Sequence, residues 1–532
     1  MRSLLLTCLL AISLHAQIQP PHAHIPQGDL EGAPTGQGPF VFKGIPYAAP
    51  PVGDLRWQPP QPAPAWTGLR DATQYAKVCY QDPTIFHISP ESMSEDCLYL
   101  NVWTPDLHPA SPAPVLVYIH GGAFVIGSGS MPDTDGTKLA TRNAVVVTLN
   151  YRLGVFGFLA HPDLSAASPQ HTSGNYGLLD QIAALRWVRQ NITAFGGDPH
   201  NVTVFGESAG ASAIGYLLIA PQAEGLFDKA ILESPSVIFQ PTPELRTTYK
   251  NLTSMETIGQ AVAPHIADLK SLPSEELMQR AEAATQKLLL PGGTRLRPET
   301  LLDTPTQVQA PWAPIVDGTI IPDQPSRLYT QNHYQRIPVM VGTNTNEGNL
   351  FLRHYHPSDL SSFTAWVNRD YAPCGKTILD TYAPASAKDA HSVADRLITD
   401  SNFLYNAFSI ARSTHAFLYR FTHVSPDGEA SGMGAFHSSE LPYVFGHTHE
   451  KNFQPYDHKL SDQMMTMWLH FARTGDPRLM ESSEWTRTGS NGEYLYMDFG
   501  DKLEVKDLPD TTMKIWTNLW PPSGKNSTCN AY

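Results

Sequence analysis

One stretch near the middle of the chain constrains the fold more than any other. Residues 201–205 alternate polar and apolar side chains and are rich in β-branched types, which predicts a strand. Gly206-Glu-Ser-Ala-Gly210 follows at once, and a helix-compatible run extends to Leu218. This arrangement is typical of a nucleophile elbow, in which a tight turn exposes the serine hydroxyl above a sheet. We therefore take Ser208 as a candidate nucleophile, with an ordinary βα turn as the alternative.

Glycines on both sides of Ser208 agree with this interpretation. In an elbow, a Cβ atom at these positions would clash with the neighbouring strand and helix, so we expect glycine at 206 and 210.

Other apolar runs predict the sheet that carries the turn. Residues 114–119 and 144–149 are continuous apolar runs, as in strands buried on both faces of a parallel sheet. Strands that alternate with helical patterns, such as 181–190, favour an α/β fold with a mostly parallel central sheet and helices on both faces. The expected strands are residues 40–47, 114–120, 144–149, 201–205, 229–233, 338–342 and 415–420.

The rest of the chain predicts one large domain. Residues 240–335 and 350–410 carry helical patterns with few strand signals, so we expect helical insertions that cap the sheet within a single domain of residues 17–532. The formal net charge of the 532 residues is −14. This acidic balance argues against a nucleic-acid partner, which requires a basic surface.

The N-terminus has the features of an export signal. Residues 1–16 contain one positive charge, a short apolar run and a small residue, Ala16, at the expected cleavage point. This pattern predicts a secretory signal peptide, too short to cross a bilayer as a helix. A buried N-terminal strand is the alternative. Since no other stretch is long and apolar enough to cross a membrane, we expect a soluble protein that is secreted or periplasmic.

Four cysteines remain after removal of the signal peptide. An even count in an oxidising compartment allows disulfides. Cys79 and Cys97 enclose a short loop and are the best pair. Cys374 and Cys529 could pair or could be free thiols.

A glycine-containing loop upstream of Ser208 suggests an oxyanion site. Residues 120–124, His-Gly-Gly-Ala-Phe, directly follow an expected buried strand. Lipases and esterases use backbone N–H groups of such a loop, together with that of the residue after the nucleophile, to hold the developing oxyanion. We assign Gly122, Ala123 and Ala209 as donors, with Gly121 allowing the chain to turn. A plain glycine turn is the alternative.

An acid and a base should follow Ser208 in the order Asp or Glu, then His. Glu347 comes just past the expected strand 338–342, in a loop at the carboxyl edge of the sheet. Asp317 is a competitor without so clear a strand before it. His437 is the candidate base, because it lies in a glycine-flanked loop with Glu440 three residues on. The nearby alternatives without such a setting are His423, His447 and His449.

These pieces together resemble the type-B carboxylesterases, a family of α/β-hydrolases that includes cholinesterases and neuroligins. The most specific match is Ser94-Glu-Asp-Cys-Leu-Tyr-Leu-Asn-Val102. The other matching stretches, in the family's order, are residues 42–56, 118–124, 206–210, 342–348 and 437–446.

The resemblance implies a role for each matching residue. Ser208 would be the nucleophile, Glu347 the acid and His437 the base. Cys79–Cys97 would be the family's first disulfide. Two further residues would hydrogen-bond toward the acid, namely Glu440 and Ser234.

Three positions depart from the family pattern. Pro235 stands where the family has glycine, which puts the role of Ser234 in doubt. The oxyanion loop reads Gly-Gly-Ala, in which alanine still offers its N–H, and it resembles loops of esterases that accept bulky, even tertiary, alcohols. The loop between Cys79 and Cys97 has no tryptophan, which argues against a choline-selective enzyme.

We therefore expect an exported serine carboxylesterase that acts on small-molecule esters without a metal or organic cofactor. A serine peptidase or amidase on the same fold is the catalytic alternative, because fold does not determine the leaving group. A non-catalytic binding or adhesion protein is the other alternative, against which the presence of Ser208 argues.

Overall fold

The computed structural model describes most of the chain, with several gaps. The predicted signal peptide, residues 1–16, and Cys529 lie outside the described residues. These are residues 19–84, 88–236, 238–250, 252–289, 311–352, 359–371, 374–449, 452–479, 484–489, 494–508 and 510–519.

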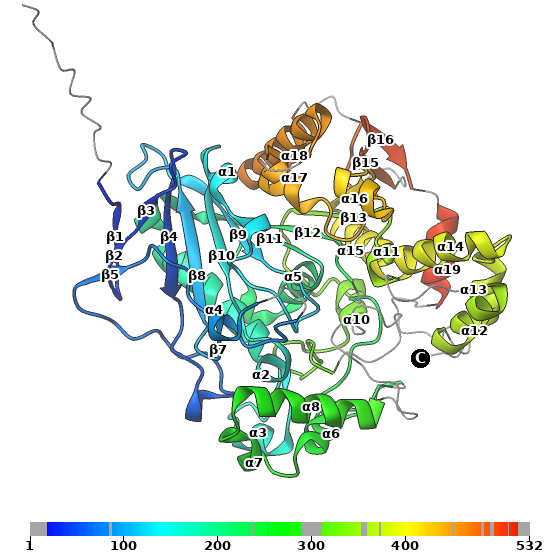
Figure 1. Cartoon of the computed structure of the whole chain (residues 1–532), viewed down its shortest axis with the longest axis horizontal. Coiled ribbons are helices and arrows are strands. Elements are labelled where there is room, and N and C mark those ends of the chain that lie inside the picture. The colour runs from blue at the N-terminus through cyan, green and yellow to red at the C-terminus, as the bar shows by residue number, and fades with distance from the viewer. Residues whose placement is uncertain are drawn as a thin grey trace, which may run out of the picture.

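An eleven-stranded sheet forms the centre of the molecule (Figure 1). Seven neighbouring strands are parallel, which confirms the predicted mostly parallel α/β sheet. In sheet order these are β10 (Val145–Leu149), β9 (Ala113–Ile119), β11 (Gly197–Glu207), β12 (Lys229–Glu233), β13 (Val339–Asn344), β14 (Phe417–Phe421) and β15 (Leu495–Phe499). Antiparallel strands flank them, namely β8 (Tyr99–Thr104), β4 (Phe40–Pro46) and β3 (Ala33–Pro34) at one end and β16 (Leu503–Asp507) at the other.

Four strands of the central sheet were not expected from the sequence, namely β3, β8, β15 and β16. In β8 and β15, polar residues interrupt the apolar pattern. In β8, Asn101 is buried, accepts the Gly44 N–H and donates to the Gly129 carbonyl. In β15, Asp498 is buried and accepts a hydrogen bond from Thr422. Tertiary hydrogen bonds thus allow these polar side chains inside the sheet.

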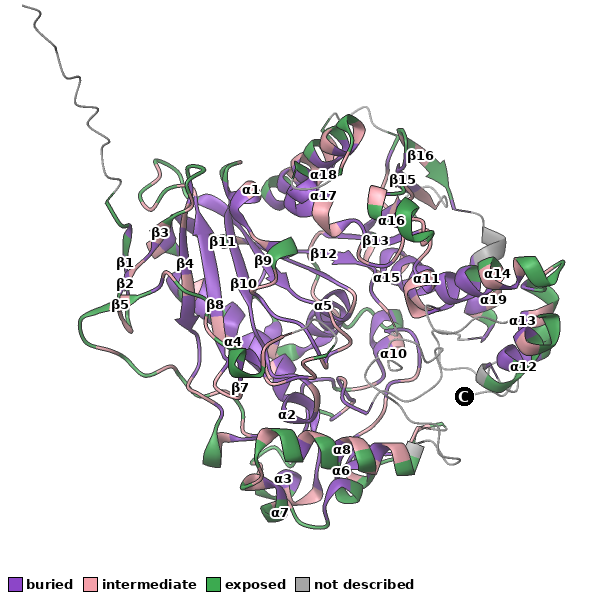
Figure 2. Cartoon of the chain, viewed as in Figure 1, coloured by how far each residue is buried: buried purple, intermediate pink, exposed green. Residues whose placement is uncertain are grey.

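Helices cover both faces of the sheet, and the central strands are therefore mostly buried, as their purple colour in Figure 2 shows. On one face α4 (Tyr176–Asn191) and α5 (Ala209–Ile219) pack against the larger core cluster, which includes Val115 and Val204. On the other, α18 (Pro455–Thr474) packs against Leu116 and Phe205. Successive residues of a strand point to opposite faces, so the two clusters share the same strands.

The segments 240–335 and 350–410 contain helices and, among their described residues, no strand of the central sheet. The first contains α6 (Met255–Val262), α7 (Ala267–Lys270), α8 (Ser274–Leu289) and α10 (Pro325–Thr330). The second contains α11 (Gly348–Phe351), α12 (Leu360–Asp370), α13 (Gly375–Thr381), α14 (Ala390–Ile398), a π-helical turn (Thr399–Leu404) and α15 (Tyr405–Thr414). Helices α6 to α8 lie together at one end of the sheet, and α12 to α14 at another side (Figure 1).

Smaller elements complete the fold. Across the described ranges, no helix combines the length and apolar character that a membrane span requires. The remaining strands are β1 (His22–Ile25), β2 (Gly28–Glu31), β5 (Leu69–Asp71), β6 (Val78–Cys79) and β7 (Met93–Ser94). The remaining α-helices of the described residues are α1 (Thr137–Ala140), α2 (Gly154–Phe158), α3 (Pro162–Ala167), α16 (Pro426–Ser431), α17 (Leu441–Phe445) and α19 (Asp510–Leu519).

Disulfides close part of this framework. Cys79 and Cys97 are joined, with their Cα atoms 4.9 Å apart, as expected. Cys374, which precedes α13, is disulfide-bonded as well.

Candidate active site

Ser208 lies at the turn between β11 and α5. Its backbone angles are φ 57° and ψ −121°, a conformation that residues with side chains rarely adopt. The Ser208 N–H donates to the Glu233 carbonyl on β12 at 2.9 Å, and the Ser208 carbonyl accepts the Ser212 N–H of α5. The strained turn is therefore held by the adjacent strand and by the helix that follows.

Close packing against β9 explains the two glycines that flank this serine. A Cβ on Gly206 would lie 2.5 Å from the Ile119 carbonyl oxygen. A Cβ on Gly210 would overlap the same oxygen. Both positions therefore need glycine, for the reason expected from the sequence.

The Gly-Gly-Ala loop reaches the Ser208 turn from the end of β9. A Cβ on Gly121 would lie 2.8 Å from the Glu207 carbonyl oxygen and 3.0 Å from the Ser208 Cβ, so the loop lies directly against the Ser208 turn. Gly122 and Ala123 have φ of 100° and 52°, which turns the loop sharply after the strand.

Three backbone N–H groups near Ser208 remain available to a ligand. Those of Gly122 and Ala123 have no hydrogen-bond acceptor within the described parts of the chain. Ala209 is the first residue of α5, and the first N–H groups of a helix have no partner inside it. The loop and the helix N-terminus together can therefore stabilise a negatively charged oxygen beside Ser208.

Glu347 and His437 form a buried hydrogen-bonded pair. His437 Nδ1 lies 2.6 Å from Glu347 Oε2. Glu347 Oε1 accepts the Ser234 hydroxyl at 2.6 Å and the Asn344 N–H at 2.7 Å. These bonds hold the carboxylate in the orientation that fixes the imidazole, and Ser234 contacts the acid directly although Pro235 follows it.

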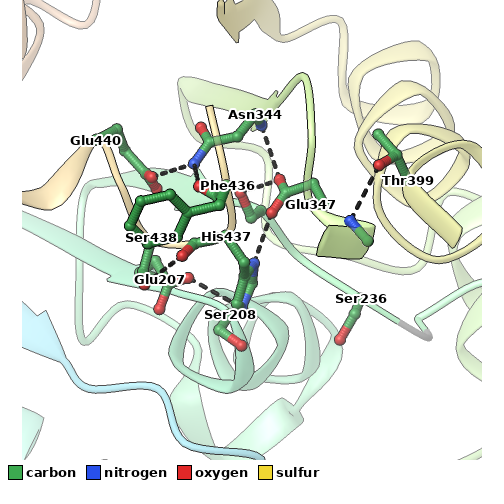
Figure 3. Close-up of polar contacts among 12 residues, drawn as sticks. Glu207, Ser208, Ser236, Asn344, Glu347, Thr399, Phe436, His437, Ser438 and Glu440 are labelled. Atoms are coloured by element: carbon green, nitrogen blue, oxygen red, sulfur yellow. Dashed lines mark hydrogen bonds and ion pairs between the residues drawn. The ribbon is translucent and has the colours of Figure 1, made fainter. Parts of the chain in front are cut away.

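The other imidazole nitrogen faces the Ser208 turn. His437 Nε2 lies 3.1 Å from Glu207 Oε1, and Glu207 directly precedes Ser208 (Figure 3). Glu207 Oε1 makes no hydrogen bond to any described residue, so the contact is an ion pair without hydrogen-bond alignment. Ser208 makes no described hydrogen bond to His437 in this arrangement. The predicted nucleophile, acid and base are thus gathered at the carboxyl edge of the sheet.

Comparisons with known proteins show what this chain is similar to. The model of the carboxylesterase family matches residues 19–516. The chain belongs to the carboxylesterase family. The para-nitrobenzyl esterase of Bacillus subtilis (strain 168) is 37% identical over 514 residues, which are 94% of this chain and 98% of that protein. The fumonisin B1 esterase of Sphingopyxis macrogoltabida is 36% identical over 511 residues, which are 93% of this chain and 89% of that protein.

A solved structure confirms the α/β-hydrolase fold of this carboxylesterase. A PNB esterase structure superposes with a TM-score of 0.76 and 32% identity, covering 93% of this chain and 99% of the other. The family and these relatives establish the protein as a carboxylic ester hydrolase that acts on small-molecule esters.

The electrostatics of the carboxylesterase site couple His437 to two carboxylates. Burial by itself lowers the pKa of His437, but the charges of Glu207 and Glu347 and the hydrogen bond to Glu347 outweigh burial and raise the pKa to about 8. Burial raises the pKa of Glu207 to about 7, although the charge of His437 acts in the opposite direction. The imidazolium form of His437 is therefore stabilised on both nitrogens.

Glu440 is linked to Glu347 through one intervening residue, Asn344, whereas Ser234 contacts Glu347 directly. Its Oε2 accepts from the Asn344 side chain, and the Asn344 N–H in turn bonds Glu347 (Figure 3). Burial raises the pKa of Glu440 well above its ordinary value, with the charges of neighbouring glutamates adding to the effect. Glu440 is thus connected to Glu347 through Asn344.

The competing candidates have other partners. Asp317 Oδ1 accepts the N–H groups of Thr319, Ile320 and Ile321, so this carboxylate stabilises its own turn. The alternative histidines are engaged elsewhere: His423 with Asp457, His447 with the Asp135 carbonyl, and His449 stacked on His458.

Two aromatic residues that no sequence pattern had indicated flank His437. The ring centroids of Phe351 and Phe403 lie 5.2 Å and 4.8 Å from that of His437. Phe351 lies one helical turn after Glu347, and this spacing could have indicated it. Phe403 comes from the π-helical turn, and π-helical turns are frequent at functional sites.

A mainly apolar cavity of about 100 Å³ lies beside the oxyanion loop. Val125 and Ile126 form part of its wall, and both donate their N–H groups to the Gly122 carbonyl at 3.0 Å. Helix α8 supplies Met278 and Ala281 to another wall. As for metals, no group of three or more His, Cys, Asp or Glu side chains in the described residues is arranged to hold an ion.

Proposed function

We propose that this protein is an exported serine carboxylesterase that hydrolyses esters through an acyl-enzyme on Ser208. The observation that carries the proposal is the position of His437. Its Nδ1 is bonded to Glu347 at 2.6 Å, and its Nε2 faces the turn that holds Ser208. A serine hydroxyl needs an oriented base of this kind to become nucleophilic.

The proposed reaction proceeds in two halves. His437 Nε2 takes the proton of the Ser208 hydroxyl as its oxygen attacks the ester carbonyl. The N–H groups of Gly122, Ala123 and Ala209 hold the resulting oxyanion. When the C–O bond of the tetrahedral intermediate breaks, the alcohol leaves with the proton from His437. Water then attacks the acyl-enzyme with the same base, which releases the acid and restores Ser208.

The cavity beside the oxyanion loop is our candidate for the apolar part of the ester. Val125 and Ile126 form part of its wall, and both donate their N–H groups to the carbonyl of Gly122, whose own N–H is a proposed oxyanion donor. A hydrocarbon chain of the substrate in this cavity would be attached to an ester carbonyl held at the loop, since ligand sites commonly combine apolar walls with a few oriented polar groups.

Activity on esters of tertiary alcohols is also part of the proposal, because the Gly-Gly-Ala loop resembles those of esterases that accept such alcohols. A panel of tert-butyl esters tests it, and no hydrolysis of any member would remove this part of the proposal.

Export is proposed from the N-terminal segment and is supported by the Cys79–Cys97 disulfide, which is typical of an oxidising compartment. N-terminal sequencing of the exported protein should begin at Gln17. A full-length intracellular product would contradict this part of the proposal.

The replacement Ser208→Ala tests the function directly. It should reduce hydrolysis of p-nitrophenyl acetate by about three orders of magnitude or more while the circular dichroism spectrum is unchanged. Near-normal turnover would refute the nucleophile. Comparing the ester with the matching anilide distinguishes an esterase from an amidase. A fluorophosphonate probe should label the native protein and not Ser208→Ala, whereas a non-catalytic binding protein would not be labelled.

A further inference from the structure

Asn346 ties the loop of the acid to the loop of the base. Its N–H donates to the Ala435 carbonyl at 2.9 Å, and its Oδ1 accepts the Ala435 N–H at 3.2 Å. Asn346 also forms an isolated β-bridge with Phe436, the residue before His437. Because Asn346 directly precedes Glu347, this short contact sets the separation of the two side chains that form the acid–base pair.

A buried carboxylate holds the other end of the Asn346 side chain. Asn346 Nδ2 donates to Asp395 Oδ2 at 2.8 Å, and Asp395, on α14, is 4% exposed. The amide of Asn346 is thus fixed with its oxygen toward Ala435 and its nitrogen toward Asp395. Without Asp395, the Asn346 nitrogen would lose a charge-assisted hydrogen bond that determines the amide orientation.

The same region of α14 also supports the residue after the acid. A Cβ on Gly348 would lie 2.8 Å from the Asp395 Cα, so the two backbones touch. One helical turn after Asp395, the Thr399 hydroxyl accepts the Gly348 N–H at 3.2 Å (Figure 3). Glu347 is therefore held on both sides, through Asn346 before it and Gly348 after it.

We propose that Asp395 is a positioning residue for the Glu347–His437 pair and acts through Asn346. The inference rests on the proposed function, because it concerns the acid and base of that reaction. Proton transfer at His437 requires a fixed imidazole, and small displacements of catalytic groups cost large factors in rate. Asp395 makes no described contact with Ser208 or with the oxyanion loop, so its effect should be on the chemical steps and not on substrate binding.

A double-mutant cycle on kcat tests the proposal, with Asp395→Ala, Asn346→Ala and the double variant. Each single variant should lower kcat for p-nitrophenyl acetate by about tenfold to a hundredfold, with KM changed by less than about threefold. The double variant should be no slower than the slower single variant, because each single replacement already breaks the hydrogen bond between Asn346 and Asp395. The rate of fluorophosphonate labelling should fall in parallel with kcat.

Asp400→Asn is the matched control. Asp400 is also buried, lies five residues beyond Asp395, and accepts the Tyr382 hydroxyl at 2.9 Å instead of contacting Asn346. This variant should change the melting temperature with little change in kcat.

Two results would overturn the proposal: a kcat of Asp395→Ala within threefold of wild type, or single effects that multiply in the double variant. If Asp395→Ala does not fold, Asn346→Ala at the half-buried loop position decides, and an unchanged kcat there overturns the proposal. Persistent activity of Ser208→Ala would instead refute the proposed function, so the two failures are distinguishable.

Discussion

His437 Nε2 lies 3.1 Å from Glu207 Oε1, one residue before Ser208 in the chain. The base of the proposed triad therefore lies between two carboxylates, because its Nδ1 is bonded to Glu347. A carboxylate on each nitrogen favours the charged imidazolium, which cannot accept a proton from Ser208. In the proposed mechanism, the contact with Glu207 should therefore move the onset of activity of the free enzyme to higher pH.

Replacing Glu207 with glutamine should move the activity to lower pH. Glu207→Gln removes one of the charges that raise the pKa of His437 to about 8, so the neutral base persists at lower pH. The acidic limb of kcat/KM, measured between pH 5 and 9, should move down by about one unit. The exposed replacement Glu224→Gln is the control and should leave the limb in place. An unmoved limb in Glu207→Gln would show that Glu207 does not control the base.

Removing the Ser234 hydroxyl should weaken the acid–base pair. Ser234→Ala deletes the 2.6 Å hydrogen bond to Glu347 Oε1 and leaves that oxygen with the Asn344 N–H. A charge-assisted bond is worth about 1.5–3 kcal/mol, so we expect kcat to fall by about tenfold or more. Ser236→Ala, in the same loop but hydrogen-bonded to Ser212 instead, is the control. Equal kcat values for the two variants would contradict the prediction.

Stability should depend on the buried carboxyl of Glu233. Burial raises the pKa of Glu233 from 4.5 to about 8, so the native state keeps a proton that the unfolded state releases between these pH values. Stability should therefore fall as pH rises through this window, by on the order of 1 kcal/mol per pH unit. Glu233→Gln, which can still accept the Trp468 N–H, should flatten this slope in urea denaturation at pH 5.5 and 7.5. An unchanged slope would refute the assignment, and Glu224→Gln again serves as control.

Filling the cavity beside the oxyanion loop should change the choice of ester. Ala281→Leu places a larger side chain in a cavity of about 100 Å³. We expect kcat/KM for long-acyl nitrophenyl esters to change by about tenfold relative to the acetate. Ala283→Leu, which faces solvent from the same helix, is the control. A uniform effect on all chain lengths would indicate that the cavity is not the substrate pocket.

Local patterns predicted the central elements of the fold. The apolar runs became β9, β10, β12, β13 and β14, because strands buried on both faces of a parallel sheet must be continuously apolar. The strand β8 was missed because Asn101 interrupts its apolar pattern. This polar side chain is tolerated inside the sheet because it accepts a hydrogen bond from Gly44, 57 residues away in the chain. Helix α18 was missed as well, although Leu460, Met464 and Trp468 recur at helical spacing and are buried.

By itself, the sequence predicted the Ser208 turn and the Gly-Gly-Ala loop, because each depends on a strand followed by a tight turn within a few residues, and it singled out Glu347 and His437 as candidates from their local settings. Only the tertiary structure decided which groups surround His437. Glu207 and Glu347 approach it from the ends of β11 and β13, and Asp395 holds Asn346 from a helix 49 residues further on. Burial and charge at such contacts depend on how distant segments pack, which no local pattern contains.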